Sequence, residues 1–209
     1  MAFNPEMIGI YGACWVISIG LHEAGHAFTA DRLGDSTPAD FGRLTLNPLV
    51  HMQPVMTAVV LPVVLISMGM PPLGAASTPY NPANFRKPIR DTALVAIAGP
   101  IVNIALAGFF SAAYLLFFRN IPQDSISFRF LEHAVWLNLI LVMFNLLPVP
   151  GLDGGSIVRA FLPRRAREIF DGARQFGILI AIILVNIPAV SFAIFFPAAL
   201  VQFLVFPPP

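Results

Sequence analysis

Long apolar runs separated by short polar segments dominate the chain. Three of them are each long enough for a helix to cross the hydrocarbon core of a bilayer, which takes about 17–25 residues: residues 7–30, 92–118 and 130–149. A fourth run starts at residue 176, and because Pro188 and Pro197 interrupt it, we expect a crossing helix over residues 176–197 that ends in a bend. The run over residues 54–70 is shorter and contains Pro62, so we predict that it re-enters the membrane without crossing.

The composition supports a membrane setting and excludes other classes of protein. Hydrophobic residues make up 57% of the 209 residues and charged residues only 11%, whereas about a quarter of a soluble domain is charged. The net charge of +1 is too small for a nucleic-acid-binding surface. The single cysteine, Cys14, excludes an internal disulfide. We therefore predict an all-α polytopic membrane protein with about four to six transmembrane or re-entrant helices in one domain, residues 1–209.

Three ionisable residues lie inside the first apolar run, where their burial in a membrane is costly. They belong to the segment His22-Glu23-Ala24-Gly25-His26. Two histidines four positions apart share one face of a helix and can bind one zinc ion, while Glu23, turned by about 100°, can reach a water molecule as general base. The segment predicts a hydrolytic zinc site; a pair of hydrogen-bonded core histidines is the alternative.

Catalytic zinc sites usually have three protein ligands, so the third must come from elsewhere in the chain. Asp153 is the best candidate, because Pro148 and Pro150 stop the preceding helix and the following Gly154-Gly155 lets the backbone approach a neighbouring group closely. Asn145 ends the same apolar run, and its amide can hydrogen-bond a substrate carbonyl or a developing oxyanion. The alternative for Asp153 is a helix cap. The other candidate ligands are the remaining carboxylates, His51, His133 and Cys14.

Taken together, these motifs resemble the site-2 protease family of intramembrane zinc metalloproteases, peptidase family M50, and within it the small branch without a PDZ domain. Residues 22–26 match its HExxH motif and residues 145–154 match its NxxPxPxxDG motif. Residues 34–48 and 98–103 are similar to two further segments of that branch.

The resemblance implies a metalloendopeptidase that cleaves single-pass membrane protein substrates. It implies one Zn²⁺ per chain on His22, His26 and Asp153, with Glu23 as general base and supporting contacts from Asn145 and Asn103. It also implies a catalytic core of the HEAGH helix, a middle helix and the helix that carries Asp153, with a short β-like segment near the active site.

Two segments depart from the pattern of this branch. His51-Met52-Gln53-Pro54 stands where a His-x-Asp-Pro element is usual, so the acidic residue is absent there. Residues 76–81 differ from the usual Lys-Pro-Val-Pro-Val-Asn element, which is thought to pair with an extended substrate. We therefore expect the substrate preference to differ while the hydrolytic chemistry is kept.

Topology follows from the position of the two motifs. His26 and Asp153 both lie at the C-terminal ends of apolar runs, so one zinc ion can join them only if those two helices are parallel. With a re-entrant segment at 54–70, ten basic residues lie on one side of the membrane and two, Arg119 and Arg129, on the other; a crossing segment would give eight and four. Because basic residues gather on the cytoplasmic side, we predict a multi-pass protein of the cell membrane with its active site near the cytoplasmic face. The basic stretch 156–171 is expected to lie on anionic lipid of the bilayer.

Three other functions compete with the protease. A membrane transporter explains broken helices with buried polar residues, but it does not explain a Glu between two His. A di-metal oxygenase needs more histidine boxes than four His can supply. A catalytically inactive relative that only binds membrane partners is the third alternative. Oligomeric state is left open by the sequence.

Overall fold

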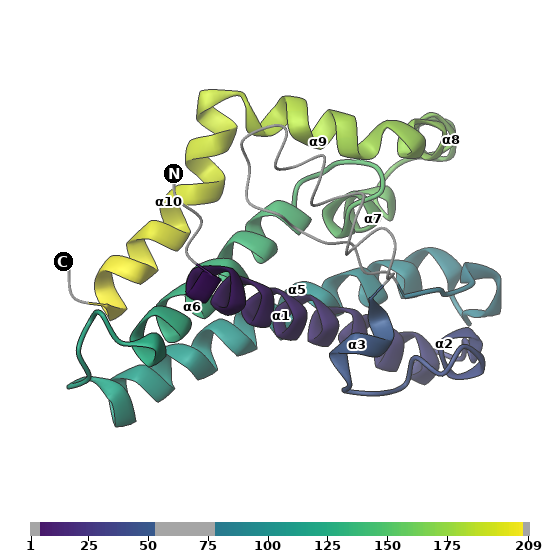
Figure 1. Ribbon diagram of the computed structural model, residues 1–209. Coiled ribbons are helices and arrows are strands. Elements are labelled where there is room, and N and C mark those ends of the chain that lie inside the picture. Colours follow the sequence, from purple (N-terminus) through teal and green to yellow (C-terminus); the bar gives the residue numbers. More distant parts are fainter. Residues whose placement is uncertain (1–4, 53–77, 207–209) are drawn as a thin grey trace.

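Three long helices form the centre of the protein. The computed structural model describes residues 5–52 and 78–206, which are mostly helical (Figure 1). Helix α1 (Pro5–Arg32) packs against both α5 (Pro88–Ala113) and α6 (Ile126–Asn145), and α5 packs against α6. Helix α5 continues into a π-helical segment, η3 (Tyr114–Phe118). The observed architecture confirms the predicted all-α polytopic fold.

Shorter helices surround this centre (Figure 1). Those of the first half are α2 (Thr37–Asp40), α3 (Pro48–His51) and the 3-10 helix η2 (Pro82–Asn84). Those of the second half are α7 (Asp153–Arg159), α8 (Arg164–Gly172), the 3-10 helix η4 (Ala173–Phe176), α9 (Gly177–Val185) and α10 (Pro188–Val205).

Four helices of the described residues are long and apolar enough to cross a membrane: residues 6–32, 88–118, 126–145 and 188–205. The first three agree with the predicted runs. The fourth corrects the predicted helix over 176–197, because the chain breaks between α9 and α10 and the continuous helix starts at Pro188. Proline cannot continue α9 but fits the first turn of a new helix. Pro197 lies inside α10. The predicted re-entrant segment 54–70 falls outside the described residues.

Helices α1 and α6 run in the same direction, as the topology argument predicts. Their N-terminal halves meet where the rings of Tyr11 and His133 lie 4.1 Å apart. Farther along both helices, Asn138 Nδ2 of α6 donates a hydrogen bond of 2.9 Å to Ser18 Oγ of α1. Beyond the end of α6, Asp153 at the start of α7 lies 3.4 Å from His26 of α1. Between the two helices, Cys14 and Trp15 of α1 pack on Leu137 of α6 in a buried apolar cluster.

Small residues bring α1 close to α5. A Cβ atom added at Gly25 would lie 2.8 Å from Val102 Cγ2 and 3.2 Å from the carbonyl oxygen of Ala98. Such contacts are closer than ordinary van der Waals distances, so only glycine permits this approach. The close packing places the polar side chains of the two helices within hydrogen-bonding reach.

The described part of the predicted β-like segment, residues 78–81, is an irregular stretch that leads into η2. Asn81 is extended, with φ −113° and ψ 107°, and the part of the chain that the structure describes contains no regular strand. The Thr78 hydroxyl donates a hydrogen bond of 2.9 Å to the carbonyl oxygen of Glu23. The stretch is therefore attached directly to the HEAGH segment.

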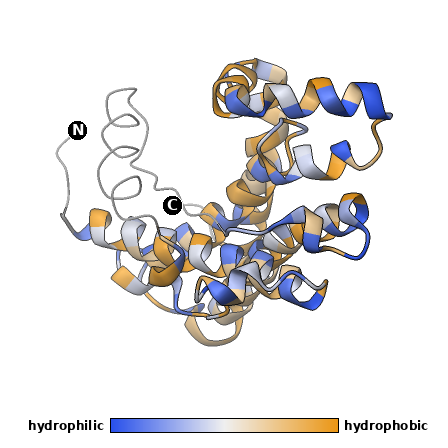
Figure 2. Cartoon of the chain, turned by 90° about the vertical axis from the view of Figure 1, so that its right-hand side faces the viewer, coloured by the Kyte–Doolittle hydropathy of each residue, from blue (hydrophilic) through white to orange (hydrophobic). Residues whose placement is uncertain are grey.

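Hydrophilic residues gather at the end of the molecule that carries α2 and α8. Figure 2 looks onto this end and shows blue segments on several of its helices and loops, beside orange segments of the bundle. This distribution suits a helical bundle whose end emerges from a membrane.

Candidate metal centre

Three potential metal ligands from distant parts of the sequence converge between α1 and the start of α7. His22 Nε2 lies 3.2 Å from Asp153 Oδ2, His26 Nε2 lies 3.4 Å from Asp153 Oδ1, and the two imidazole Nε2 atoms are 3.0 Å apart. Both histidines are buried and Asp153 is half-buried. The structure thus brings together the three residues that the sequence predicts as metal ligands.

The far side of each imidazole ring is held by an oxygen atom of α5. His22 Nδ1 lies 2.6 Å from Asn103 Oδ1, and His26 Nδ1 lies 2.7 Å from the carbonyl oxygen of Val95. A carbonyl oxygen can only accept, so His26 must carry its proton on Nδ1. Asn103 uses its NH₂ group elsewhere, as a donor to Ser18 and Asn138, so its oxygen faces His22 and that ring too is protonated on Nδ1. Both Nε2 atoms therefore present lone pairs to the shared space, as metal ligands do.

These protonation states provide a test of whether the site fits a metal ion. Two Nε2 lone pairs 3.0 Å apart cannot hydrogen-bond to each other. Asp153 Oδ2 is buried and has no hydrogen-bond partner, although it lies close to His22. A cation between the three atoms would satisfy all of them, and two imidazole nitrogens with one carboxylate are a donor set typical of catalytic Zn²⁺. The residues present therefore fit zinc.

A tight turn delivers Asp153 to the two histidines. The chain leaves α6 at Asn145, turns at Gly151 with φ 97°, and begins α7 at Asp153. Cβ atoms added at Gly154 and Gly155 would collide with the carbonyl oxygens of Leu146 and Val149. The glycines that the sequence singles out thus allow α7 to pack directly on the turn, and this packing fixes the position of Asp153.

The other predicted site residues occupy different positions around this centre. Glu23 is buried, with 8% of its surface exposed, and lies on α1 between the two histidine ligands, outside the cluster of the three ligand atoms. Asn103 is fully buried and contacts His22, as described above. Asn145 is half-buried at the end of α6, and among the described residues its side chain makes no hydrogen bond to the cluster.

His51 and His133 lie apart from the three ligands. His51 is fully buried in α3, where its Nε2 lies 3.0 Å from the carbonyl oxygen of Thr45. His133 contacts Tyr11 near the N-terminal ends of α1 and α6, at the opposite end of these helices from Asp153. In the described part of the chain, neither belongs to the group that could hold a metal ion.

Sequence reasoning missed several residues at this centre. Gly99 lies directly against both imidazole rings. A Cβ atom added at Gly99 would lie 2.5 Å from His22 Nε2 and 2.6 Å from His26 Cε1. Asn138 and Ser18 complete a buried hydrogen-bond network behind Asn103. A polar Asn in the middle of a membrane-spanning run is the signal that could have identified Asn138.

Tyr80 is a further polar residue in the surroundings of the site. Burial raises the pKa of its phenol, Arg174 lowers it, and the carboxylates of Asp153 and Glu23 raise it again. The net effect is a raised pKa, so the phenol remains a neutral hydrogen-bond donor at physiological pH. Its ring stacks on Phe85, with ring centroids 6.0 Å apart, which holds the end of the stretch 78–81 in place.

Comparisons with known proteins show the family of this chain. Residues 119–188, which include the turn at Asp153, match the family model described as Peptidase family M50. The chain is 34% identical over 184 residues to YwhC of Bacillus subtilis (strain 168), covering 86% of this chain and 81% of YwhC. It is 36% identical over 179 residues to Rip2 of Mycobacterium tuberculosis (strain H37Rv), covering 86% of this chain and 67% of Rip2. The names of both relatives assign them provisionally to the zinc metalloproteases. No solved structure matches the chain.

A buried two-histidine, one-carboxylate centre in a bundle of apolar helices defines a class, the membrane metalloendopeptidases. Within that class, the chain belongs to peptidase family M50, the site-2 protease family. The family resemblance predicted from the two sequence motifs is confirmed.

Proposed function

We propose that this protein hydrolyses peptide bonds within or next to transmembrane segments of other membrane proteins, in regulated intramembrane proteolysis. One observation carries the proposal: His22, His26 and Asp153 converge at the inner side of a bundle whose long helices are apolar enough to span a membrane. A transporter would not require this ligand geometry with a buried Glu between the two histidines.

Each residue of the centre receives a role from its position. His22, His26 and Asp153 would hold Zn²⁺, which when bound supplies a Lewis acid that lowers the pKa of a coordinated water and polarises the scissile carbonyl. Glu23 accepts a proton from the attacking water and later delivers it to the leaving nitrogen. Asn103 holds His22 in its ligand orientation, 2.6 Å from Nδ1. Asn145 is assigned to a hydrogen bond with the substrate carbonyl or the developing oxyanion.

The substrates are single-pass membrane proteins that unwind near the cut. A helix engages every peptide carbonyl in its own hydrogen bonds, so water cannot attack until the segment opens locally. Segments with Gly, Pro or Asn near the scissile bond are therefore preferred. Replacing them with Leu stabilises the substrate helix by about 1 kcal/mol for Gly and about 3 kcal/mol for Pro, and slower cleavage of the stiffened segments is expected.

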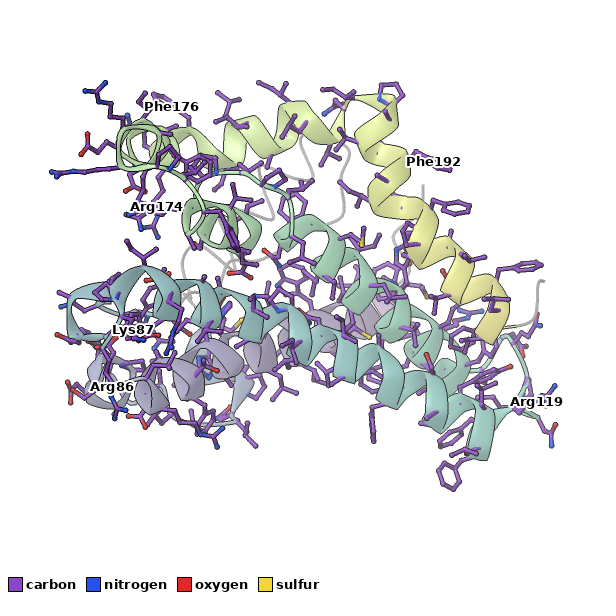
Figure 3. All side chains as sticks on the ribbon, turned by 180° about the vertical axis from the view of Figure 1, so that it is seen from behind. Arg86, Lys87, Arg119, Arg174, Phe176 and Phe192 are labelled. Carbon is purple, nitrogen blue, oxygen red and sulfur yellow. The ribbon has the colours of Figure 1, made fainter. Side chains whose placement is uncertain are left out.

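We place the active site near the cytoplasmic face of the cell membrane. Arg174, whose carbonyl oxygen lies within 3.5 Å of a Cβ added at Gly151, belongs to the same end of the molecule as the turn at Asp153. Figure 3 shows Arg86, Lys87 and Arg174 together at this end and Arg119 at the opposite end. The charge distribution supports this orientation through the excess of basic residues on cytoplasmic segments.

The proposal is tested by measuring metal binding and peptide cleavage separately. Purified full-length protein is incubated with labelled single-pass segments, and bound zinc is measured in parallel. Glu23→Gln should retain zinc while cleavage falls by about 10²–10⁴-fold, because Glu23 transfers protons and holds no metal. His22→Ala should lose zinc and cleavage together, and Asp153→Ala should reduce both. Glu168→Gln, at an exposed position of α8, is the matched control and should change neither.

Two outcomes would overturn these assignments. Wild-type protein that binds zinc but cleaves none of the segments would favour the inactive relative. Loss of zinc in Glu23→Gln as complete as in His22→Ala would make Glu23 a ligand.

A further inference from the structure

A buried hydrogen-bond network behind the metal centre joins all three long helices. Asn138, in the middle of α6, is fully buried, and its Nδ2 donates to Ser18 Oγ of α1 at 2.9 Å and to the Ala134 carbonyl oxygen at 2.8 Å. Its Oδ1 accepts a hydrogen bond of 2.7 Å from Asn103 Nδ2 of α5. Asn103 in turn contacts His22.

The orientation of every amide in this network is determined by its partners. The Ala134 carbonyl oxygen can only accept, so the NH₂ group of Asn138 must face it and the oxygen of Asn138 must face Asn103. That oxygen requires the NH₂ group of Asn103, which also donates to the carbonyl oxygen of Ser18 at 3.3 Å. Only then does the oxygen of Asn103 face His22.

A chain of obligatory donors and acceptors thus runs from Asn138 to the imidazole. If the amide of Asn103 were reversed, its NH₂ group would face His22 Nδ1. Nδ1 would then have to accept, and the proton would move to Nε2, where it would occupy the lone pair that faces the shared ligand space. The direction of one amide therefore decides whether His22 can act as a ligand.

We propose that Asn138 is a positioning residue of the metal centre, which acts through Asn103 to keep His22 in its zinc-binding tautomer. The inference rests on the proposed function only in so far as it concerns the same metal, and zinc affinity tests it without any cleavage assay. It assigns a role to a residue 15 positions upstream of the ligand Asp153 and two hydrogen bonds away from His22.

Zinc affinity of the purified full-length protein, measured by competition with a chelator, is the primary measurement. Asn138→Leu removes the acceptor for Asn103 but keeps the branched shape and the number of side-chain heavy atoms. It should weaken zinc binding by about 10–100-fold, the usual effect of losing an outer hydrogen-bond partner of a ligand. Ser18→Ala removes a single hydroxyl and should weaken binding in the same direction by less. If Asn138→Leu does not fold, Ser18→Ala carries the test.

Val135→Ala provides the matched control for packing. Val135 is also fully buried in α6 and lies in an apolar cluster with Tyr114 and Phe128. This variant should lower the melting temperature and leave zinc affinity within about twofold of wild type, because the loss of buried methyl groups destabilises the fold without altering the network.

A double-mutant cycle distinguishes an effect transmitted through Asn103 from a general loss of helix packing. In an Asn103→Leu background, Asn138→Leu should weaken zinc binding by less than twofold, because coupled residues are not additive. Multiplicative effects of the two substitutions, or weakened binding in Val135→Ala equal to that in Asn138→Leu, would overturn the inference. Wild-type affinity in Asn138→Leu would overturn it while leaving the proposed function intact, whereas wild-type protein without zinc would overturn both.

Discussion

At the scale of single residues, Gly99 has a role that depends on its missing side chain. It lies in α5 opposite the two histidine ligands, and a Cβ there would stand 2.5 Å from His22 Nε2. The imidazoles therefore occupy the space that any other residue would fill. Because a backbone Cβ cannot move away as a flexible side chain can, the rings would have to leave their positions.

We predict that Gly99→Ala abolishes or greatly weakens zinc binding, by about 100-fold or more, a loss at least as large as that of an outer hydrogen-bond partner. Gly108→Ala is the matched control, because it lies in the same helix and an added Cβ there has no atom within 4 Å. Alanine favours a helix by about 1 kcal/mol over glycine, so the control should be neutral or slightly stabilised. Equal zinc affinity in the two variants, measured by chelator competition, would contradict this account.

At the scale of elements, Asp35 joins the start of α2 to the stretch 78–81 and to η2. Its carboxylate accepts hydrogen bonds from the backbone N–H and the hydroxyl of Thr37. It also accepts from the backbone N–H of Asn81 at 2.7 Å and from the side-chain Nδ2 of Asn84 at 2.7 Å. Asp35 thereby fixes the stretch 78–81 from one side, while Thr78 attaches it to Glu23. The stretch 78–81 is thus held by a buried acid that has no cationic partner among the described residues.

The pKa of Asp35 predicts how this element responds to pH. Burial acts to raise that pKa, but the hydrogen bonds from Thr37, Asn84 and Asn81 outweigh burial and hold it below its ordinary value of 3.8. A pKa that is lower in the folded than in the unfolded state stabilises the fold above the unfolded pKa, and the stabilisation is lost as pH falls through the folded pKa.

Asp35→Asn should therefore destabilise the protein at pH 7 by about 2 kcal/mol or more, because a hydrogen bond to a charged group contributes about 1.5–3 kcal/mol. The difference in melting temperature between wild type and variant should shrink as pH falls below about 4. Asp40→Asn, at an exposed position in the same region, is the control and should have a small effect. A pH-independent difference for Asp35→Asn would show that the charge of Asp35 is unimportant.

At the scale of the whole molecule, the exposed apolar surface and the charged ends are separated. Phe117 of η3 and Leu204 of α10 are 78% and 71% exposed, which in a soluble protein would mark an aggregation or interaction surface. In a bilayer these side chains face lipid. The basic residues labelled in Figure 3 lie at the two ends, with most of them at the end that carries the turn before Asp153.

Site-directed labelling tests the orientation that this separation predicts. In a Cys14→Ser background, single cysteines at Ser36 and Glu168 should react with an impermeant thiol reagent only from the cytoplasmic side, and one at Gln123 only from outside. The parent without cysteine should remain unlabelled. Labelling of Ser36 and Glu168 from opposite sides would contradict the parallel arrangement of α1 and α6, and labelling of both from outside would place the metal centre near the external face.

The sequence by itself determined the membrane class, three of the four helices long and apolar enough to span a membrane, and the three candidate ligands His22, His26 and Asp153 that the structure brings together. These predictions depend on local properties: apolar run length, the spacing of two histidines on one helix face, and a Pro/Gly turn that leaves one carboxylate beside an apolar run. The parallel direction of α1 and α6 follows from them, because one metal ion must join both ends.

Only the tertiary structure decided what surrounds the ligands. The roles of Gly99 and Asn138 arise from contacts between helices, and Asn138 meets Ser18 across 120 positions of sequence. The sequence marks Pro188 as an interruption but places the spanning helix over 176–197. A proline can stand at a helix start or inside a helix, as Pro188 and Pro197 do in α10, so the sequence alone could not place this helix. Apolar patterning marks the faces that helices bury, but which polar atoms meet there depends on how closely and in which rotation the helices pack.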